Sequence, residues 1–557
     1  MNKIQPGATI STEIQRDTTE SAVRPRDPII LICWLLACGG FVFWRSFHVS
    51  YGFDDIAHLH ALAAYRSGEI SLTTWLLHNH NEHFLPLVRL YFMAATKISG
   101  LSSSAMHVFL FLNYVAGAFG CAWISFSLTR SRLGAFLAGT IFAGAGGFIG
   151  SMLWQPSDGE FSIAGTPFIF AIAILVSPYA RKRWTDAAVL LLILASALGL
   201  GSIAVPALAI PLYLLLARPD TMPPGRRKRM IVLSASLIAA ILLATKWLMV
   251  THQTRTLHFA VQGIYDGLFL VFSTGGRFLL AWTPFDEFAL PVDIAASLAG
   301  WALIVLTFRW VPKPLRQLLV ALWATSALMA LLIGMGRWKI ATYIDFAATD
   351  RYHYVFLLPL TLQAAAVLDH MTRRLLQAAS PPRKRAVSVA LACLLLAALV
   401  MSHIRFKKQM DVLDWVIVQH RQEFREAKVL ARIIRNKAAT QPLHLAEGPI
   451  RFWGSLNIHM GLSCIIFTQF PKGLPNIEWT LNRVPTTSVG SPWDVPPIPE
   501  ADAVVENQIL DEWSQKINRP PYSCMINGKM QDVLPVKSCA EAAKISPPPL
   551  APPRPFW

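Results

Sequence analysis

The sequence predicts an all-α polytopic membrane protein with about eleven transmembrane helices, amphipathic helices in the first outer loop, and a small extracytoplasmic C-terminal region. Of its 557 residues, 54% are hydrophobic and 15% are charged, and the mean hydropathy is +0.43. A soluble domain carries about 25% charged residues, so this composition suits a chain whose solvent is mostly lipid. The hydrophobic residues also gather in separate runs near the length that crosses a bilayer.

Residues 1–27 are polar and of mixed charge, and we expect a disordered cytoplasmic segment there. The transmembrane domain is predicted over residues 28–404. Its first apolar run, 28–47, is followed by no small-residue cleavage site, which indicates an uncleaved anchor. Further runs follow at roughly 104–128, 133–153, 161–178, 186–200, 203–217, 230–250, 291–309, 317–336, 353–372 and 386–404.

The two runs between 186 and 217 are short for separate spans. Gly199, Gly201 and Pro206 interrupt the apolar sequence there, and such residues break helices. We therefore predict a hairpin, which keeps all the basic loops on one side of the membrane.

Basic residues in alternate loops give the orientation. They are Arg130, Arg132, Arg181, Lys182, Arg183, Arg226, Arg227, Lys228, Arg229, Lys313, Arg316, Arg373, Arg374, Arg383, Lys384 and Arg385. The loops near 154–160 and 200–202 contain no Lys or Arg. The positive-inside rule then puts the N-terminus in the cytoplasm, and the segments 48–103, 251–290, 337–352 and 405–557 outside. The net charge of +17 is accordingly attributed to membrane anchoring rather than to nucleic-acid binding.

Two outer segments carry further structure. In the loop 251–290, the apolar stretch 268–282 is interrupted by Gly275, Gly276 and Arg277, which predicts a re-entrant or interfacial helix. The C-terminal region, 405–557, opens with an amphipathic helix near 408–437, becomes irregular, and ends in a Pro-rich stretch that is extended or disordered. Its Cys524 and Cys539 form a disulfide or remain free thiols; sequence spacing leaves both open.

Adjacent carboxylates, Asp54 and Asp55, follow the first span directly, with His58 close behind. A carboxylate beside a low-dielectric surface can have a raised pKa, which suits a general base. The alternative is structural, since either carboxylate can cap an amphipathic helix over 56–67.

A histidine-rich segment at 78–83 precedes Arg89 and contains His80, Glu82 and His83. Imidazole and carboxylate groups ligate zinc or manganese, so a divalent metal is one interpretation, although the spacing matches no recognised zinc motif. The others are a polar loop before a helix and a polar surface that orients a substrate. The sequence contains neither a Walker A loop nor a dinucleotide fingerprint.

Basic residues also occur outside, against the topology rule. Arg337 and Lys339 follow the ninth span, and Arg351 with Tyr352 precedes the tenth. An arginine among interfacial aromatics can hold a phosphate through two hydrogen bonds, whereas the aromatics alone would be an ordinary interfacial belt. Further candidates for the same cavity are Arg277, Asp286 and Glu287 in the loop 251–290.

These features, in this order, resemble the GT-C superfamily of membrane glycosyltransferases, which includes protein O-mannosyltransferases and lipid A aminoarabinose transferases. The resemblance covers roughly residues 28–404. It rests on Asp54–Asp55 after the first span, the amphipathic segment 56–83, the segment NEHFLPLVR at 81–89, and Arg351–Tyr352 before a late span.

The resemblance implies juxtamembrane helices in the first outer loop and an enzyme of a bacterial inner membrane. It implies inverting transfer of a sugar from a polyprenyl-phosphate donor to a lipid, glycan or protein acceptor on the extracytoplasmic face. Asp54 would be the base, with Asp55 second. The donor phosphate would bind Arg351, with Tyr352, Arg89, Arg337 and Lys339 as further candidates, and the cavity would be lined by His58, His80, Glu82 and His83. The pair is Asp-Asp where protein O-mannosyltransferases usually carry Asp-Glu, and residues 405–557 match no module that names the acceptor.

Other function classes predict different features. A transporter or flippase of a lipid-linked glycan would carry ionisable residues near the midplane of its spans, where Lys246 is the clearest example. A non-catalytic membrane scaffold would tolerate the loss of both Asp54 and Asp55. A glycan polymerase or ligase would use a large basic outer loop, and the loop 251–290 contains few Arg or Lys residues.

Overall fold

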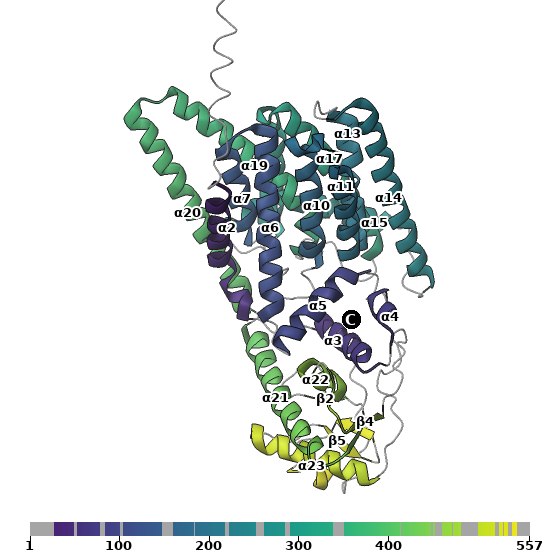
Figure 1. The fold of residues 1–557 in the computed structure, drawn as a ribbon. Coiled ribbons are helices and arrows are strands. Elements are labelled where there is room, and N and C mark those ends of the chain that lie inside the picture. The colour runs from purple at the N-terminus through teal and green to yellow at the C-terminus, as the bar shows by residue number, and fades with distance from the viewer. Residues whose placement is uncertain are drawn as a thin grey trace, which may run out of the picture.

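The computed structural model describes residues 27–48, 53–68, 70–77, 84–100, 104–146, 160–182, 184–217, 222–251, 261–283, 290–337, 350–412, 414–446, 449–451, 459–470, 472–480, 500–518, 523–526, 529–532 and 537–542. A bundle of apolar helices forms the larger part. Three short helices lie at one end of the bundle, and a smaller region of helices and short strands lies beyond them (Figure 1).

The helices of the bundle correspond to the predicted apolar runs. They are α2 (Asp27–Phe43) with η1 (Trp44–His48), α6 (Ser104–Thr129), α7 (Arg132–Gly144), α10 (Glu160–Val176), α11 (Trp184–Gly199), α13 (Ala209–Ala217), α14 (Pro224–Thr251), α16 (Leu290–Thr307), α17 (Lys313–Arg337), α19 (Asp350–Ala378) and α20 (Pro381–Val412). Within the described residues, seven are long and apolar enough to cross a membrane, and four apolar helices are shorter. The helical membrane fold is thereby confirmed, while eleven crossings remain a prediction.

The segment 184–217 is a broken hairpin, as predicted. After α11 the chain turns through η4 (Gly201–Ile203) and α12 (Ala204–Ala207) into α13. Asp186, in the first turn of α11, accepts a 2.6 Å hydrogen bond from Arg226, and the Leu216 carbonyl, at the end of α13, accepts one of 3.1 Å from Gln317. Both ends of the hairpin therefore lie at the basic end of the bundle, while Gly201, in the turn, lies against Phe84 of the first loop.

The predicted interfacial helix is α15 (Val261–Leu280), which runs without a break through Gly275. It packs against α16 and α17 where glycines meet. A Cβ at Gly300 would lie 2.4 Å from the Gly275 carbonyl oxygen, and one at Gly334 would lie 2.3 Å from the Gly263 carbonyl oxygen. The glycines therefore bring helix backbones together rather than interrupting the helix.

The segment predicted to form the first outer loop contains α3 (Phe53–Arg66), α4 (Leu72–Leu77) and α5 (Pro86–Ser99), which lie between the bundle and the C-terminal region (Figure 1). The structural alternative for the acidic pair was that Asp54 or Asp55 caps an amphipathic helix over 56–67. The helix begins earlier, at Phe53, so both acidic residues lie in its first turn. The capping interpretation is corrected accordingly, because the apolar pattern that marks a helix starts only after its polar first turn.

The C-terminal region contains more regular structure than the sequence predicted. The expected helix at 408–437 is the end of α20 followed by α21 (Asp414–Ala438). Beyond it lie β1 (Leu443–Ala446), β2 (Pro449–Arg451), β3 (His459–Gly461), α22 (Leu462–Gln469), β4 (Ile477–Thr480), α23 (Glu500–Ile517), β5 (Ser523–Ile526), β6 (Lys529–Asp532) and α24 (Cys539–Ala542). β1 and β4 pair in parallel, and β2–β3 and β5–β6 pair antiparallel. Strands of three or four residues are too short for an alternating pattern to stand out.

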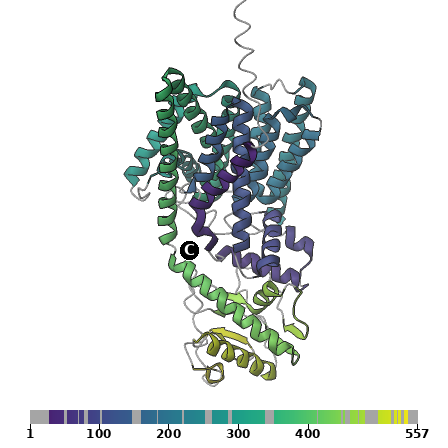
Figure 2. The same ribbon diagram turned by 60° about the vertical axis from the view of Figure 1, so that its left-hand side comes forward.

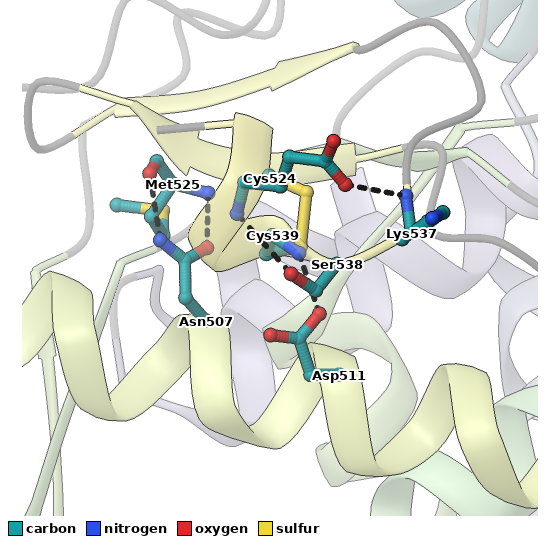
Figure 3. The surroundings of a disulfide bond; sticks show 8 residues. Asn507, Asp511, Cys524, Met525, Lys537, Ser538 and Cys539 are labelled. Carbon is teal, nitrogen blue, oxygen red and sulfur yellow. Dashed lines mark hydrogen bonds between the residues drawn. A yellow bond between two sulfur atoms is a disulfide. The ribbon is translucent and has the colours of Figure 1, made fainter. Parts of the chain in front are cut away.

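A disulfide joins Cys524 of β5 to Cys539 of α24, which decides the alternative that spacing left open (Figure 3). Helix α23 holds both sides of it. The Asn507 side chain donates to the Met525 carbonyl at 2.8 Å and accepts from the Met525 amide at 2.7 Å. Asp511, one turn further along, accepts from the Cys539 amide at 2.5 Å. The helix, hairpin and disulfide thus form one connected unit.

Candidate functional site

The three first-loop helices pack through aromatic and arginine side chains. The Tyr65 ring of α3 stacks on Trp75 of α4, with ring centroids 5.2 Å apart. Arg89 of α5 donates a hydrogen bond to the Trp75 carbonyl, and the His58 imidazole lies 5.1 Å from the Phe92 ring. Two of the candidate site residues, His58 and Arg89, are therefore buried in one unit with the helix whose first turn carries the acidic pair.

Arg89 is a buried cation. Its side chain is 2% exposed, and its Nε has no hydrogen-bond partner in the part of the chain that the structure describes. Burial lowers the pKa of Arg89 to about 10, so the guanidinium still carries its charge at neutral pH. A buried charge with few partners is costly unless an anion compensates it, which makes Arg89 a candidate to face a bound phosphate or carboxylate.

Asp54 and Asp55 are the second and third residues of α3. Their side chains lie outside the described residues. The helix supplies one electrostatic effect through its backbone. The N-terminal end of a helix carries partial positive charge, which favours the ionised form of a carboxylate in its first turn. This is the form that accepts a proton.

The first turn of α19 carries Arg351, whose side chain is also outside the described residues. The next residues fix this helix end. Tyr352 is buried, and the His353 imidazole lies 2.8 Å from the Thr274 hydroxyl of α15. The Tyr354 ring lies against Gly165 of α10, where a Cβ would come within 2.5 Å of it. The helix end that carries Arg351 is thus held on two sides.

Helix α15 exposes apolar side chains and buries polar ones, which is the reverse of a helix on the surface of a soluble protein. Its exposed residues include the apolar or aromatic Val261, Tyr265 and Leu268, whereas its buried face carries Asp266 and Arg277. Apolar residues outward and polar residues inward suit a helix that faces lipid on one side, and inward ionisable groups in membrane proteins often mark functional cavities.

Asp266 was not selected from the sequence. It is 1% exposed, and one carboxylate oxygen accepts from Gln262 at 2.9 Å. The other oxygen has no hydrogen-bond partner among the residues described. Arg277, selected earlier, lies within electrostatic reach of Asp293 of α16. The sequence contains a signal for this face, because polar residues recur at 266, 273, 274 and 277 with helical spacing, but the apolar stretch 268–282 obscures it.

Several sequence predictions lie outside the described residues. They are His80, Glu82, His83, Asp286, Glu287 and Lys339, together with the side chain of Arg337 at the end of α17. Among the residues that the structure does describe, no three His, Cys, Asp or Glu side chains come together to hold a metal ion. The histidine-rich segment is not among them, so the metal interpretation stays open.

No protein-family model matches the sequence, and no curated protein matches it. Among solved structures, the chain is similar to ArnT from Cupriavidus metallidurans bound to undecaprenyl phosphate, at 13% identity and a TM-score of 0.44, over 87% of this chain and 90% of that chain. The apo state of the same protein gives 13% identity and a TM-score of 0.46, over 80% and 84% respectively. At this level of identity the likeness assigns neither an activity nor a site residue to this chain.

Proposed function

We propose that this protein is a membrane glycosyltransferase of the GT-C type, which transfers a sugar with inversion from a polyprenyl-phosphate donor to an acceptor on the extracytoplasmic face. The observation that supports this most is a series of close contacts that connects two segments far apart in sequence. Tyr354 of α19 lies on Gly165 of α10, Gly199 of α11 lies on Ala164 beside it, and Gly201 lies on Phe84 of the first loop. The helix end with Arg351 and the helices with the acidic pair thus share one end of the bundle.

The proposed chemistry uses these groups in fixed roles. The lipid tail of the donor stays in the bilayer, and its phosphosugar enters the space beside α3 and α19. Asp54 accepts the proton of an acceptor hydroxyl, and the hydroxyl oxygen attacks the anomeric carbon from the face opposite the phosphate. The bond between the anomeric carbon and the phosphate oxygen breaks, and polyprenyl phosphate leaves. Arg351, assisted by the buried charge of Arg89, stabilises the negative charge that develops on that phosphate.

The site is proposed to face the periplasm of a bacterial inner membrane. The Arg66 side chain of the first loop donates a 2.7 Å hydrogen bond to the Phe467 carbonyl of the C-terminal region, so these two regions lie on the same side of the bundle. The Cys524–Cys539 disulfide supports an oxidising compartment for that side. The basic loops at the opposite end support a cytoplasmic location there.

The test is transfer of label from a panel of radiolabelled polyprenyl-phosphate sugars, using purified wild type, Asp54→Asn and the control Asp27→Asn. The control removes a carboxylate at the opposite end of the first helix, where Asp27 pairs with Arg132. We expect wild type and Asp27→Asn to move label to an added membrane extract or to water. Asp54→Asn should lose at least about 100-fold in rate, because an amide cannot act as a general base.

Two results would contradict the proposal in different ways. Transfer by Asp54→Asn at the wild-type rate would remove Asp54 as the base. Absence of transfer from every donor by folded wild type, with the extract present, would argue against the enzyme and favour a transporter or a scaffold.

A further inference from the structure

The C-terminal region contacts the first outer loop through α22. This helix lies between α3 and the rest of the C-terminal region (Figure 1, Figure 2). Its Ile465 and Ile466 are fully buried and Phe467 nearly so. Gln469, at its end, lies so close to Gly100 after α5 that a Cβ there would come within 2.9 Å of the amide nitrogen. The contact between these two segments, about 400 residues apart, is therefore closely packed.

Arg66 makes hydrogen bonds across this contact. It is the last residue of α3, and its guanidinium donates to the Phe467 carbonyl at 2.7 Å and to the Thr96 hydroxyl of α5 at 2.9 Å. The Phe467 carbonyl lies in the last turn of α22, where a helix leaves its carbonyls without partners of its own. A single side chain thus joins α3, α5 and α22 through charge-assisted hydrogen bonds.

A second arginine makes a similar connection at the other end of the loop. Arg45 of η1 pairs with Asp411 near the end of α20. Along the sequence, Asp54 and Asp55 therefore lie between two arginines, Arg45 and Arg66, which bond to Asp411 and Phe467 respectively. Helix α21 follows α20 directly and packs against α22, where the Arg435 guanidinium lies 5.7 Å from the centre of the Phe470 ring. The partners of Arg45 and Arg66 therefore lie on α20 and α22, and α21 connects these two helices.

We propose that the C-terminal region is the platform that positions the acidic pair, and that Arg66 is the positioning residue through which it acts. The part that concerns transfer rests on the function proposed above. At 1.5 Å per residue, Arg66 is about 18 Å along α3 from Asp54, so a tilt of about 5° at Arg66 moves Asp54 by roughly 1.6 Å. A misplacement of about 1 Å at a reacting group can cost 100-fold in rate.

The experiment compares wild type, Arg66→Gln, Arg66→Lys and the control Lys97→Gln in full-length protein. Lys97 is an exposed cation in the last turn of α5, one residue after Thr96. Hydrogen–deuterium exchange of α3, α22 and the bundle reports docking without reference to activity. Steady-state transfer gives kcat and the KM for the donor.

We expect Arg66→Gln to raise exchange at least about 10-fold in α3 and α22 while the bundle stays protected. We expect kcat to fall about 10- to 100-fold with the donor KM changed less than about threefold. Arg66→Lys keeps one donor group and the charge, so it should recover part of both, and Lys97→Gln should match wild type.

The outcomes separate this inference from the proposed function. Unchanged exchange in both Arg66 variants would overturn the docking role. Raised exchange with an unchanged kcat would overturn the positioning role. If wild type transfers no sugar, the proposed function fails, and with it the positioning role, whereas the exchange data still support or overturn the docking itself.

Discussion

The Arg89 guanidinium lies between α4 and α5, where it donates a hydrogen bond to the Trp75 carbonyl, and burial lowers the pKa of Arg89 to about 10. Replacing a buried charge by an apolar side chain of similar size is often neutral or stabilising. If the charge serves folding, its removal should destabilise the protein. If it serves a bound anion, its removal should weaken that anion instead.

We therefore predict that Arg89→Met changes the free energy of unfolding by less than about 2 kcal/mol but weakens polyprenyl-phosphate binding at least about 10-fold. Thermal unfolding and binding of the labelled lipid phosphate in detergent measure the two effects. A large fall in stability with unchanged lipid affinity would assign Arg89 a structural role only.

An effect on folding can also be separated from an effect on donor binding at Arg351, in the first turn of α19. We predict that Arg351→Ala weakens donor binding about 10- to 100-fold, because an arginine that binds a phosphate with two hydrogen bonds contributes roughly 1.5–3 kcal/mol. Arg309→Ala is the control, since Arg309 lies on the opposite end of the bundle over the Trp310 ring. Unchanged donor affinity would move the phosphate role to Arg337, Lys339 or Arg89.

At the scale of elements, α15 depends on close backbone contact with α16. Gly275 and Gly300 meet there, and a side chain at Gly300 would collide with the Gly275 carbonyl oxygen. Because apolar side chains gain little from packing on one another in lipid, small residues that let backbones approach contribute much of the association between membrane helices.

We predict that Gly300→Leu displaces α15, lowers the melting temperature and reduces the yield of folded protein, because overpacking a close helix contact typically costs about 1–3 kcal/mol. Gly225→Ala is a matched control, since a Cβ at Gly225 in the first turn of α14 meets nothing within 4 Å. Fluorescence-detected size exclusion across a temperature series would compare them. Equal melting temperatures for the two variants would contradict the packing argument.

At the scale of the whole molecule, the first loop and the C-terminal region lie at one end of the bundle and the clustered basic residues at the other. This arrangement agrees with an odd number of crossings between the N-terminus and the C-terminal region. The first loop and the C-terminal region must therefore lie in the same compartment, whichever way the protein is oriented in the membrane.

We predict that reporters fused after Ala438 read as extracytoplasmic, with active alkaline phosphatase and no fluorescence from a cytoplasmic reporter. In intact cells, Cys524 and Cys539 should resist alkylation until a reductant is added. A cytoplasmic readout would mean a miscounted span, and would place the acidic pair on the wrong face for the proposed donor.

The sequence alone determined the apolar runs, the basic loops, the acidic pair after the first span and the presence of a helix in the loop 251–290, because hydropathy, charge and helical period are local properties of a chain. It missed Asp266, since a single inward carboxylate barely changes the apolar character of its window. It also missed the strands of the C-terminal region, which are too short to show alternation.

Tertiary structure decided which distant residues meet. The Arg66–Phe467 hydrogen bond, the Arg45–Asp411 ion pair and the His353–Thr274 contact join residues 401, 366 and 79 positions apart. Nothing in the local sequence of either partner specifies the other, because such contacts depend on how whole helices pack and on where the chain returns. The platform beneath the acidic pair is therefore visible only once the last part of the chain is folded against the first.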